Sequence, residues 1–140
     1  EDYTWLKGTL LKLNKISCLF AVGIVFLLFI SPWIYNLWIG ERVRVPFVVS
    51  TAMALYAIMM VFISPYSHYI NGIGKLDIVF KVVIVTSLLY IPMAVTLAKS
   101  SLQLTGVILS TCIINSINIP LYIIQTYKII NRRATGIWNK

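Results

Sequence analysis

Four long stretches without a charged residue divide the chain. They cover residues 16–40, 45–74, 82–98 and 100–127, and basic residues lie in the short segments between them and near both ends. A helix needs about 20 consecutive apolar residues to cross the hydrocarbon core of a membrane. The pattern therefore predicts four membrane-spanning segments, at residues 16–38, 46–69, 78–98 and 105–127.

Each predicted span must be helical, because the bilayer core offers no water to satisfy free backbone groups and four segments cannot close a barrel. We expect an all-α integral membrane protein with four transmembrane helices. Residues 1–15 carry Leu6, Leu10 and Leu13 at helical spacing together with lysines, a pattern typical of an interfacial lead-in helix. The alternative is the tail of a preceding loop. Residues 128–140 form a basic tail.

The composition supports a membrane protein and excludes other classes. Hydrophobic residues make up 59% of the chain, charged residues only 11%, and the mean hydropathy is +0.88. A soluble domain has roughly 25% charged residues, so a soluble enzyme and a disordered chain are both excluded. The net charge of +8 does not indicate a nucleic-acid partner, because the basic residues flank apolar runs. Because the sequence begins with Glu1, we expect a piece of a longer protein, or else a processed chain.

The distribution of Lys and Arg predicts the orientation in the membrane. With four spans, both termini and the middle loop lie on one side. That side carries nine basic residues, Lys7, Lys12, Lys15, Lys75, Lys81, Lys128, Arg132, Arg133 and Lys140, and the other side carries three, Arg42, Arg44 and Lys99. Lys and Arg are in excess in cytoplasmic segments, so we expect both termini in the cytoplasm.

Motifs for catalysis or cofactor binding are absent from the sequence. It contains no P-loop, no H-E-x-x-H zinc motif and no G-x-S-x-G elbow, and its single histidine, His68, stands at a span end. Cys18 and Cys112 lie in apolar spans without paired spacing, so we expect both to be buried and unpaired. We therefore predict no enzyme activity, no cofactor and no metal site.

A row of polar residues lies in the fourth span. Its members are three and four positions apart and share one helix face: Thr111, Asn115, Asn118, Tyr122 and Gln125. Side-chain amides facing lipid would be costly, so this face should meet other helices or a water-filled path. One interpretation is hydrogen bonding between helices. The other is one wall of a hydrophilic translocation path.

Each span contains one proline in its interior, Pro32, Pro65, Pro92 or Pro120, and the second span also begins with Pro46. Proline removes a backbone hydrogen bond and bends a helix, and broken helices are common in transporters. We treat Pro92 and Pro120 as hinge candidates. The alternative is that they are merely tolerated, as prolines often are in membrane helices.

Three basic residues are candidates for contact with an anionic substrate. Lys81 lies just inside the third span, and Arg42 and Arg44 lie in the short outer loop. Arginine suits phosphate binding. The alternatives are that Lys81 extends its side chain to the membrane surface and that the arginines belong to a solvated turn.

Three segments together resemble a known family. They are residues 31–40 (SPWIYNLWIG), residues 69–75 (YINGIGK) and residues 134–140 (ATGIWNK). In this order, and with these span lengths, the chain resembles the C-terminal end of bacterial polysaccharide-biosynthesis proteins. These are the O-antigen flippases of the multidrug/oligosaccharidyl-lipid/polysaccharide exporter superfamily.

The resemblance implies the last four helices of a two-lobed exporter. It further implies a role in moving polyprenyl-pyrophosphate-linked oligosaccharide across the bacterial inner membrane by alternating access. The implied partners are membrane lipids, the lipid-linked oligosaccharide and the remaining helices of the full-length transporter. The resemblance transfers no defined site residue to this chain.

Two other functions compete with this expectation. The chain could be a small four-helix drug exporter that acts as a dimer, although none of its four acidic residues lies inside a span, where proton-coupled exporters usually need one. It could also be a non-transporting membrane scaffold, whose polar row is sealed by partner helices.

Overall fold

A computed structural model describes residues 3–40 and 45–139 and is built almost entirely of helix. Its helices are α1 (Tyr3–Ile39), α2 (Phe47–Ile73), α3 (Asp77–Lys99) and α4 (Gln103–Ile130), followed by the short 3-10 helix η2 (Gly136–Asn139). Within the described ranges there is no strand, and all four α-helices are long and apolar enough to cross a membrane. The predicted fold class is therefore confirmed, and the chain is a multi-pass membrane protein.

The first helix is longer than a membrane is thick. α1 runs without a break through 37 residues, which corresponds to about 55 Å at the usual rise per residue. The hydrocarbon core of a bilayer is only about 30 Å thick. The lead-in predicted from the sequence thus belongs, from Tyr3 onward, to the same helix as the first span.

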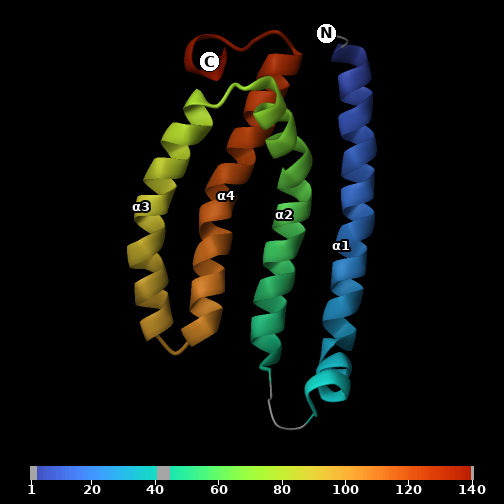
Figure 1. Ribbon diagram of the computed structural model, residues 1–140, viewed down its shortest axis with the longest axis vertical. Helices are drawn as coiled ribbons and strands as arrows, with labels where there is room; N and C mark the ends of the chain where they lie inside the picture. Colours follow the sequence, from blue (N-terminus) through green and yellow to red (C-terminus); the bar gives the residue numbers. More distant parts are fainter. Residues whose placement is uncertain (1–2, 41–44, 140) are drawn as a thin grey trace.

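The helices alternate in direction and form an open row. The start of α1, the α2–α3 connection and η2 lie at one end of the molecule, here called the termini end. The end of α1, the start of α2 and the α3–α4 connection lie at the opposite end (Figure 1). α4 lies between α2 and α3, and α1 lies on the far side of α2. The order across the row is therefore α1, α2, α4, α3, with α1 touching α4 only over a small area.

The α2–α3 connection is a tight turn. Gly74 follows α2 with φ 71°, in the left-handed region, and its N–H donates to the Asn71 carbonyl over 3.2 Å. Glycine adopts this conformation without strain, which makes it the usual residue after a helix. Asp77 begins α3, where the helix dipole favours a negative charge.

A small apolar core closes the termini end of the row. Ile70 of α2 is fully buried and packs with Ile78 and Val79 of α3 and Ile129 of α4. Elsewhere little is buried, at most 17% of the most apolar window of any helix. So large an exposed apolar surface requires an apolar environment, which lipid and further helices both provide.

The segment after α4 folds back over this core. Trp138 of η2 packs against the isoleucine and valine cluster, and the Lys128 ammonium lies 3.8 Å from the centre of its indole ring. Arg132 lies over the ring of Tyr3 at the start of α1, 5.2 Å from its centre. Two cation–π contacts thus hold the tail across the termini end.

Candidate functional site

The predicted polar row lies along one face of α4. At the end of the row that is farther from the termini end, the side chains form hydrogen bonds within α4 itself. The Thr111 hydroxyl donates to the Val107 carbonyl over 3.2 Å, and Asn115 Nδ2 donates to the Thr111 carbonyl over 3.0 Å. Both side chains are half-buried. These bonds satisfy the donors of Thr111 and Asn115 without any partner from another helix.

At the termini end of the row, Gln125 joins α4 to the α2–α3 connection. Its side chain is fully buried, and Nε2 donates to the Lys75 carbonyl over 2.9 Å. The other amide atom, Oε1, is buried and accepts no hydrogen bond. For Gln125 the structure therefore shows a contact between α4 and the α2–α3 connection, and its side-chain oxygen is left without a donor.

Asn118 and Tyr122 occupy the middle of the row. Tyr122 packs against the apolar core of the termini end. The Asn118 side-chain oxygen, Oδ1, is buried and has no hydrogen-bond partner. Leaving a buried acceptor unpaired costs about 1–3 kcal/mol, so the row contains two oxygens, on Asn118 and Gln125, that would gain from a new donor.

Two of the four prolines inside helices are compensated by serine hydroxyls. Each proline frees the carbonyl four residues before it. The Leu28 carbonyl, freed by Pro32, accepts from the Ser31 hydroxyl over 2.8 Å. The Val61 carbonyl, freed by Pro65, accepts over 3.1 Å from Ser17, which is buried in the α1–α2 contact.

The hinge candidates lack this compensation. Pro92 and Pro120 are exposed within α3 and α4. Across the part of the chain that is described, no side chain donates to the carbonyls that they free, those of Leu88 and Ser116. A helix is easier to bend where a hydrogen bond is already missing, which is consistent with the prediction of hinges at these two positions.

The basic candidates are not brought together with the polar row. Lys81 is exposed near the start of α3, where its side chain can reach the membrane surface. Arg42 and Arg44 lie outside the described residues. The structure therefore shows no cluster of Lys81 with the amides of α4.

The two cysteines differ from each other. Cys112 is buried, with its sulfur 4.0 Å from the Ala52 carbonyl, as expected for a small apolar residue. Cys18 is exposed, so the prediction that both are buried is wrong for Cys18. It follows Ser17, which faces α2, and therefore lies on a different face of α1. Among the described residues no group of three or more His, Cys, Asp or Glu side chains could hold a metal ion.

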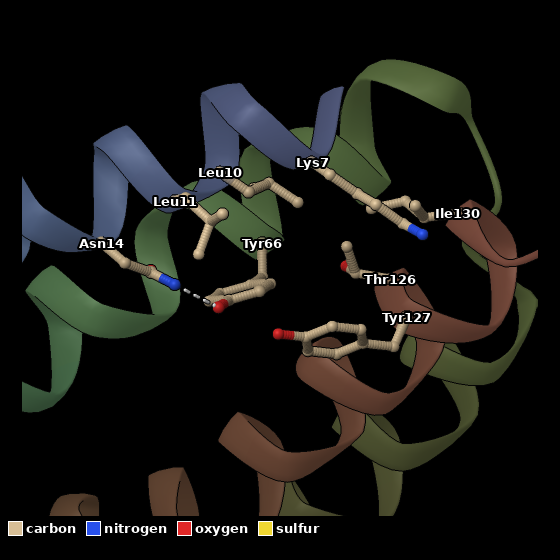
Figure 2. Close-up of a pocket in the computed structure, with 8 residues that line it drawn as sticks. All are labelled: Lys7, Leu10, Leu11, Asn14, Tyr66, Thr126, Tyr127 and Ile130. Atoms are coloured by element: carbon tan, nitrogen blue, oxygen red, sulfur yellow. Dashed lines mark hydrogen bonds between the residues drawn. The ribbon is translucent and has the colours of Figure 1, made fainter. Parts of the chain in front are cut away.

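A second polar cluster, which was not predicted from the sequence, lies where α1, α2 and α4 meet at the termini end (Figure 2). Asn14 Nδ2 donates to the Tyr66 hydroxyl over 2.7 Å, and Thr126 is fully buried beside them. The spacing of residues in the first helix could have indicated this cluster. Lys7, Leu10, Asn14 and Ser17 are spaced three, four and three, which places them on one face of α1.

No family model, no curated protein and no solved structure matches the chain. The helices and their polar contacts thus define a class, multi-pass helical membrane proteins, on physical grounds alone.

Proposed function

We propose that the four helices form part of a flippase that moves polyprenyl-pyrophosphate-linked oligosaccharide across a bacterial inner membrane by alternating access. The resemblance of residues 31–40, 69–75 and 134–140 to O-antigen flippases supports this cargo. The open row leaves room for the remaining helices of such a protein, because most of the apolar surface of each helix is uncovered. No covalent bond is made or broken in such a process, so the chain is not an enzyme.

The observation that carries this proposal is the pair of unpaired amide oxygens on α4. Asn118 Oδ1 and Gln125 Oε1 are buried acceptors without donors. An oligosaccharide is rich in hydroxyl donors, and these would satisfy both oxygens once neighbouring helices part. The packed state is thus raised in energy relative to an open, sugar-bound state, which is the differential affinity that a carrier needs.

The remaining candidates take supporting roles in this mechanism. Pro92 and Pro120 let α3 and α4 bend as the cavity opens and closes. Lys81 attracts the pyrophosphate at the mouth of the path, as do Arg42 and Arg44 at the opposite end.

In the proposed orientation the termini end faces the cytoplasm. Support comes from the described basic residues at that end, Lys7, Lys12, Lys15, Lys75, Lys81, Lys128, Arg132 and Arg133, against Lys99 at the other. A tag placed after Lys140 should be reached by antibody only in permeabilised cells. Staining of intact cells would contradict the orientation.

The proposal is tested by replacing Asn118 with leucine in the complete protein in its host cell. Asn118→Leu removes an acceptor and keeps the branched shape of the side chain, so the protein should accumulate normally. Transport of the lipid-linked sugar should fall about tenfold, the effect of one lost hydrogen bond of about 1.4 kcal/mol. The measurement is the amount of long-chain glycan on the cell surface.

The matched control is Ser116→Leu on the same helix. Ser116 is exposed, and its hydroxyl bonds only to the Cys112 carbonyl of its own helix. This variant should assemble glycan as the unmodified protein does. Equal glycan levels in the Asn118 and Ser116 variants would rule out a sugar contact at Asn118.

One observation favours a second function, a non-transporting membrane scaffold. The bond from Gln125 to the Lys75 carbonyl closes the termini end of the polar row within this chain. If the row stays sealed along its length, α4 contributes only to packing. Access of water to Asn118 distinguishes the two functions.

A further inference from the structure

A cavity of about 150 Å³ lies between α1, α2 and α4 at the termini end (Figure 2). A bound water needs roughly 10–15 Å³ of such space, so the cavity has room for a much larger group. Leu11 and Tyr127, which line it, are 62% and 53% exposed. The cavity is therefore open toward the outer surface of the helices.

Two residues that line the cavity each carry a buried polar atom without a hydrogen-bond partner. The atoms are Thr126 Oγ1, on a fully buried residue, and Asn14 Oδ1. Buried polar atoms are nearly always paired in native proteins. Two unpaired atoms beside one cavity indicate that a polar molecule belongs there.

The cavity offers more donors than acceptors. The Tyr66 hydroxyl accepts from Asn14 Nδ2, so its own proton is available to a ligand. Lys7, Thr126 and Tyr127 add an ammonium and two hydroxyl groups, and in Figure 2 the Tyr127 ring points toward Tyr66. Asn14 Oδ1 adds one acceptor. This set suits an anionic group that also carries a hydroxyl donor.

The surroundings of the cavity also favour an anion. The termini end carries eight described Lys and Arg residues, and the only acidic residue among the described part of the chain is Asp77. Basic pockets between transmembrane helices bind anionic lipid headgroups. The rest of the lining is mainly apolar, as Leu10 and Ile130 show, and this suits the start of an acyl chain.

We propose that this cavity binds an anionic glycerophospholipid whose headgroup carries a hydroxyl. Lys7 and the hydroxyls of Thr126, Tyr66 and Tyr127 donate to the phosphate. The headgroup hydroxyl donates to Asn14 Oδ1, and the acyl chains leave the cavity past Leu11. The bound lipid joins the start of α1 to the end of α4, two segments that otherwise touch only over a small area.

The proposal is tested with the purified protein in uncharged detergent micelles. Phosphatidylglycerol is titrated in, and its affinity is obtained from the rise in the thermal unfolding midpoint, because a ligand that binds only the folded state stabilises it. Phosphatidylglycerol should raise the midpoint, whereas phosphatidylcholine, which lacks net charge and a hydroxyl, should not. Soluble glycerol phosphate should bind far more weakly, because it lacks the acyl chains.

Two variants separate binding from folding. Thr126→Val removes an unpaired buried hydroxyl, so without lipid it should be at least as stable as the unmodified protein. Its affinity for phosphatidylglycerol should nevertheless fall about tenfold, the usual effect of losing a hydrogen bond to a charged group. Lys7→Gln should lose affinity to a similar extent.

The matched controls are Lys12→Gln, exposed on the same helix, and Thr51→Val, exposed on α2. Both should bind phosphatidylglycerol as the unmodified protein does. Four results would overturn the proposal: equal effects of the two lipids, no effect of either lipid, an equal effect of soluble glycerol phosphate, or full affinity in Thr126→Val. No effect of either lipid would mean that the cavity holds only water.

Discussion

At the scale of single residues, Ser17 shows how one hydroxyl can join two membrane helices. It reaches the Val61 carbonyl because Pro65 has no N–H to donate to it. Replacing Ser17 with alanine leaves that carbonyl without a donor in apolar surroundings. We expect Ser17→Ala to lower the free energy of unfolding in detergent by about 1 kcal/mol.

The same replacement in a Pro65→Ala background provides the control. The alanine introduced there supplies the missing N–H, so the additional effect of Ser17→Ala should shrink toward zero. The difference between the two backgrounds is the coupling energy of the pair. Identical losses in both backgrounds would mean that the Ser17 hydroxyl does not compensate for the proline.

Gly106 is a second residue on which the packing depends. A β-carbon added at Gly106 would collide with the Leu97 carbonyl oxygen and lie 3.0 Å from Leu97 Cβ, whereas one added at Gly23 would meet nothing. Gly106→Ala should therefore destabilise the α3–α4 hairpin by about 1–3 kcal/mol. Gly23→Ala, in the middle of α1, should be neutral or stabilising, because alanine favours helix. Thermal unfolding of both variants measures this, and similar midpoints would contradict the close approach of α3 and α4.

At the scale of elements, the sequence predicted where the helices lie along the chain better than which helices pack against each other. The helical period and the uncharged stretches define α2, α3 and α4 to within a few residues. They also place Thr111 to Gln125 on one face of α4. They do not reveal what that face meets. The bond of Gln125 to Lys75 and that of Asn14 to Tyr66 join residues 50 and 52 positions apart, and such pairs depend on how whole helices dock.

The contact of η2 with α4 gives a test at this scale. Trp138 packs on the core of the termini end and receives the Lys128 ammonium on its ring. Trp138→Ala removes both interactions, which together are worth about 1–2 kcal/mol. The tail should then open more often, and trypsin should cleave at Arg132 and Arg133 about tenfold faster.

Ile137→Ala serves as the control for this experiment. Ile137 lies in the same short helix, but its side chain is 48% exposed. Cleavage of this variant should proceed near the rate of the unmodified protein. Equal acceleration in the two variants would show that the tail is not held by Trp138.

At the scale of the whole molecule, the open row of helices is the feature that the sequence could not predict. Apolar periodicity shows that a helix is surrounded by apolar groups, but lipid and protein neighbours leave the same pattern. The order α1, α2, α4, α3 depends on close approaches such as that of Gly106 and on buried hydroxyls such as that of Ser17. It leaves α4 with a neighbour on each side and a polar face with two unpaired oxygens.

Whether water reaches Asn118 is the most direct test of a carrier path along α4. Asn118→Cys is introduced after Cys18 and Cys112 have been replaced by alanine. Ser116→Cys, at an exposed position on the same helix, is the control. A charged thiol reagent is then applied to cells that are making the glycan. The account predicts labelling at position 118 and none at position 116, because only a hydrated thiol ionises and reacts. Protection of position 118 throughout would contradict a carrier path and leave α4 as a sealed packing helix.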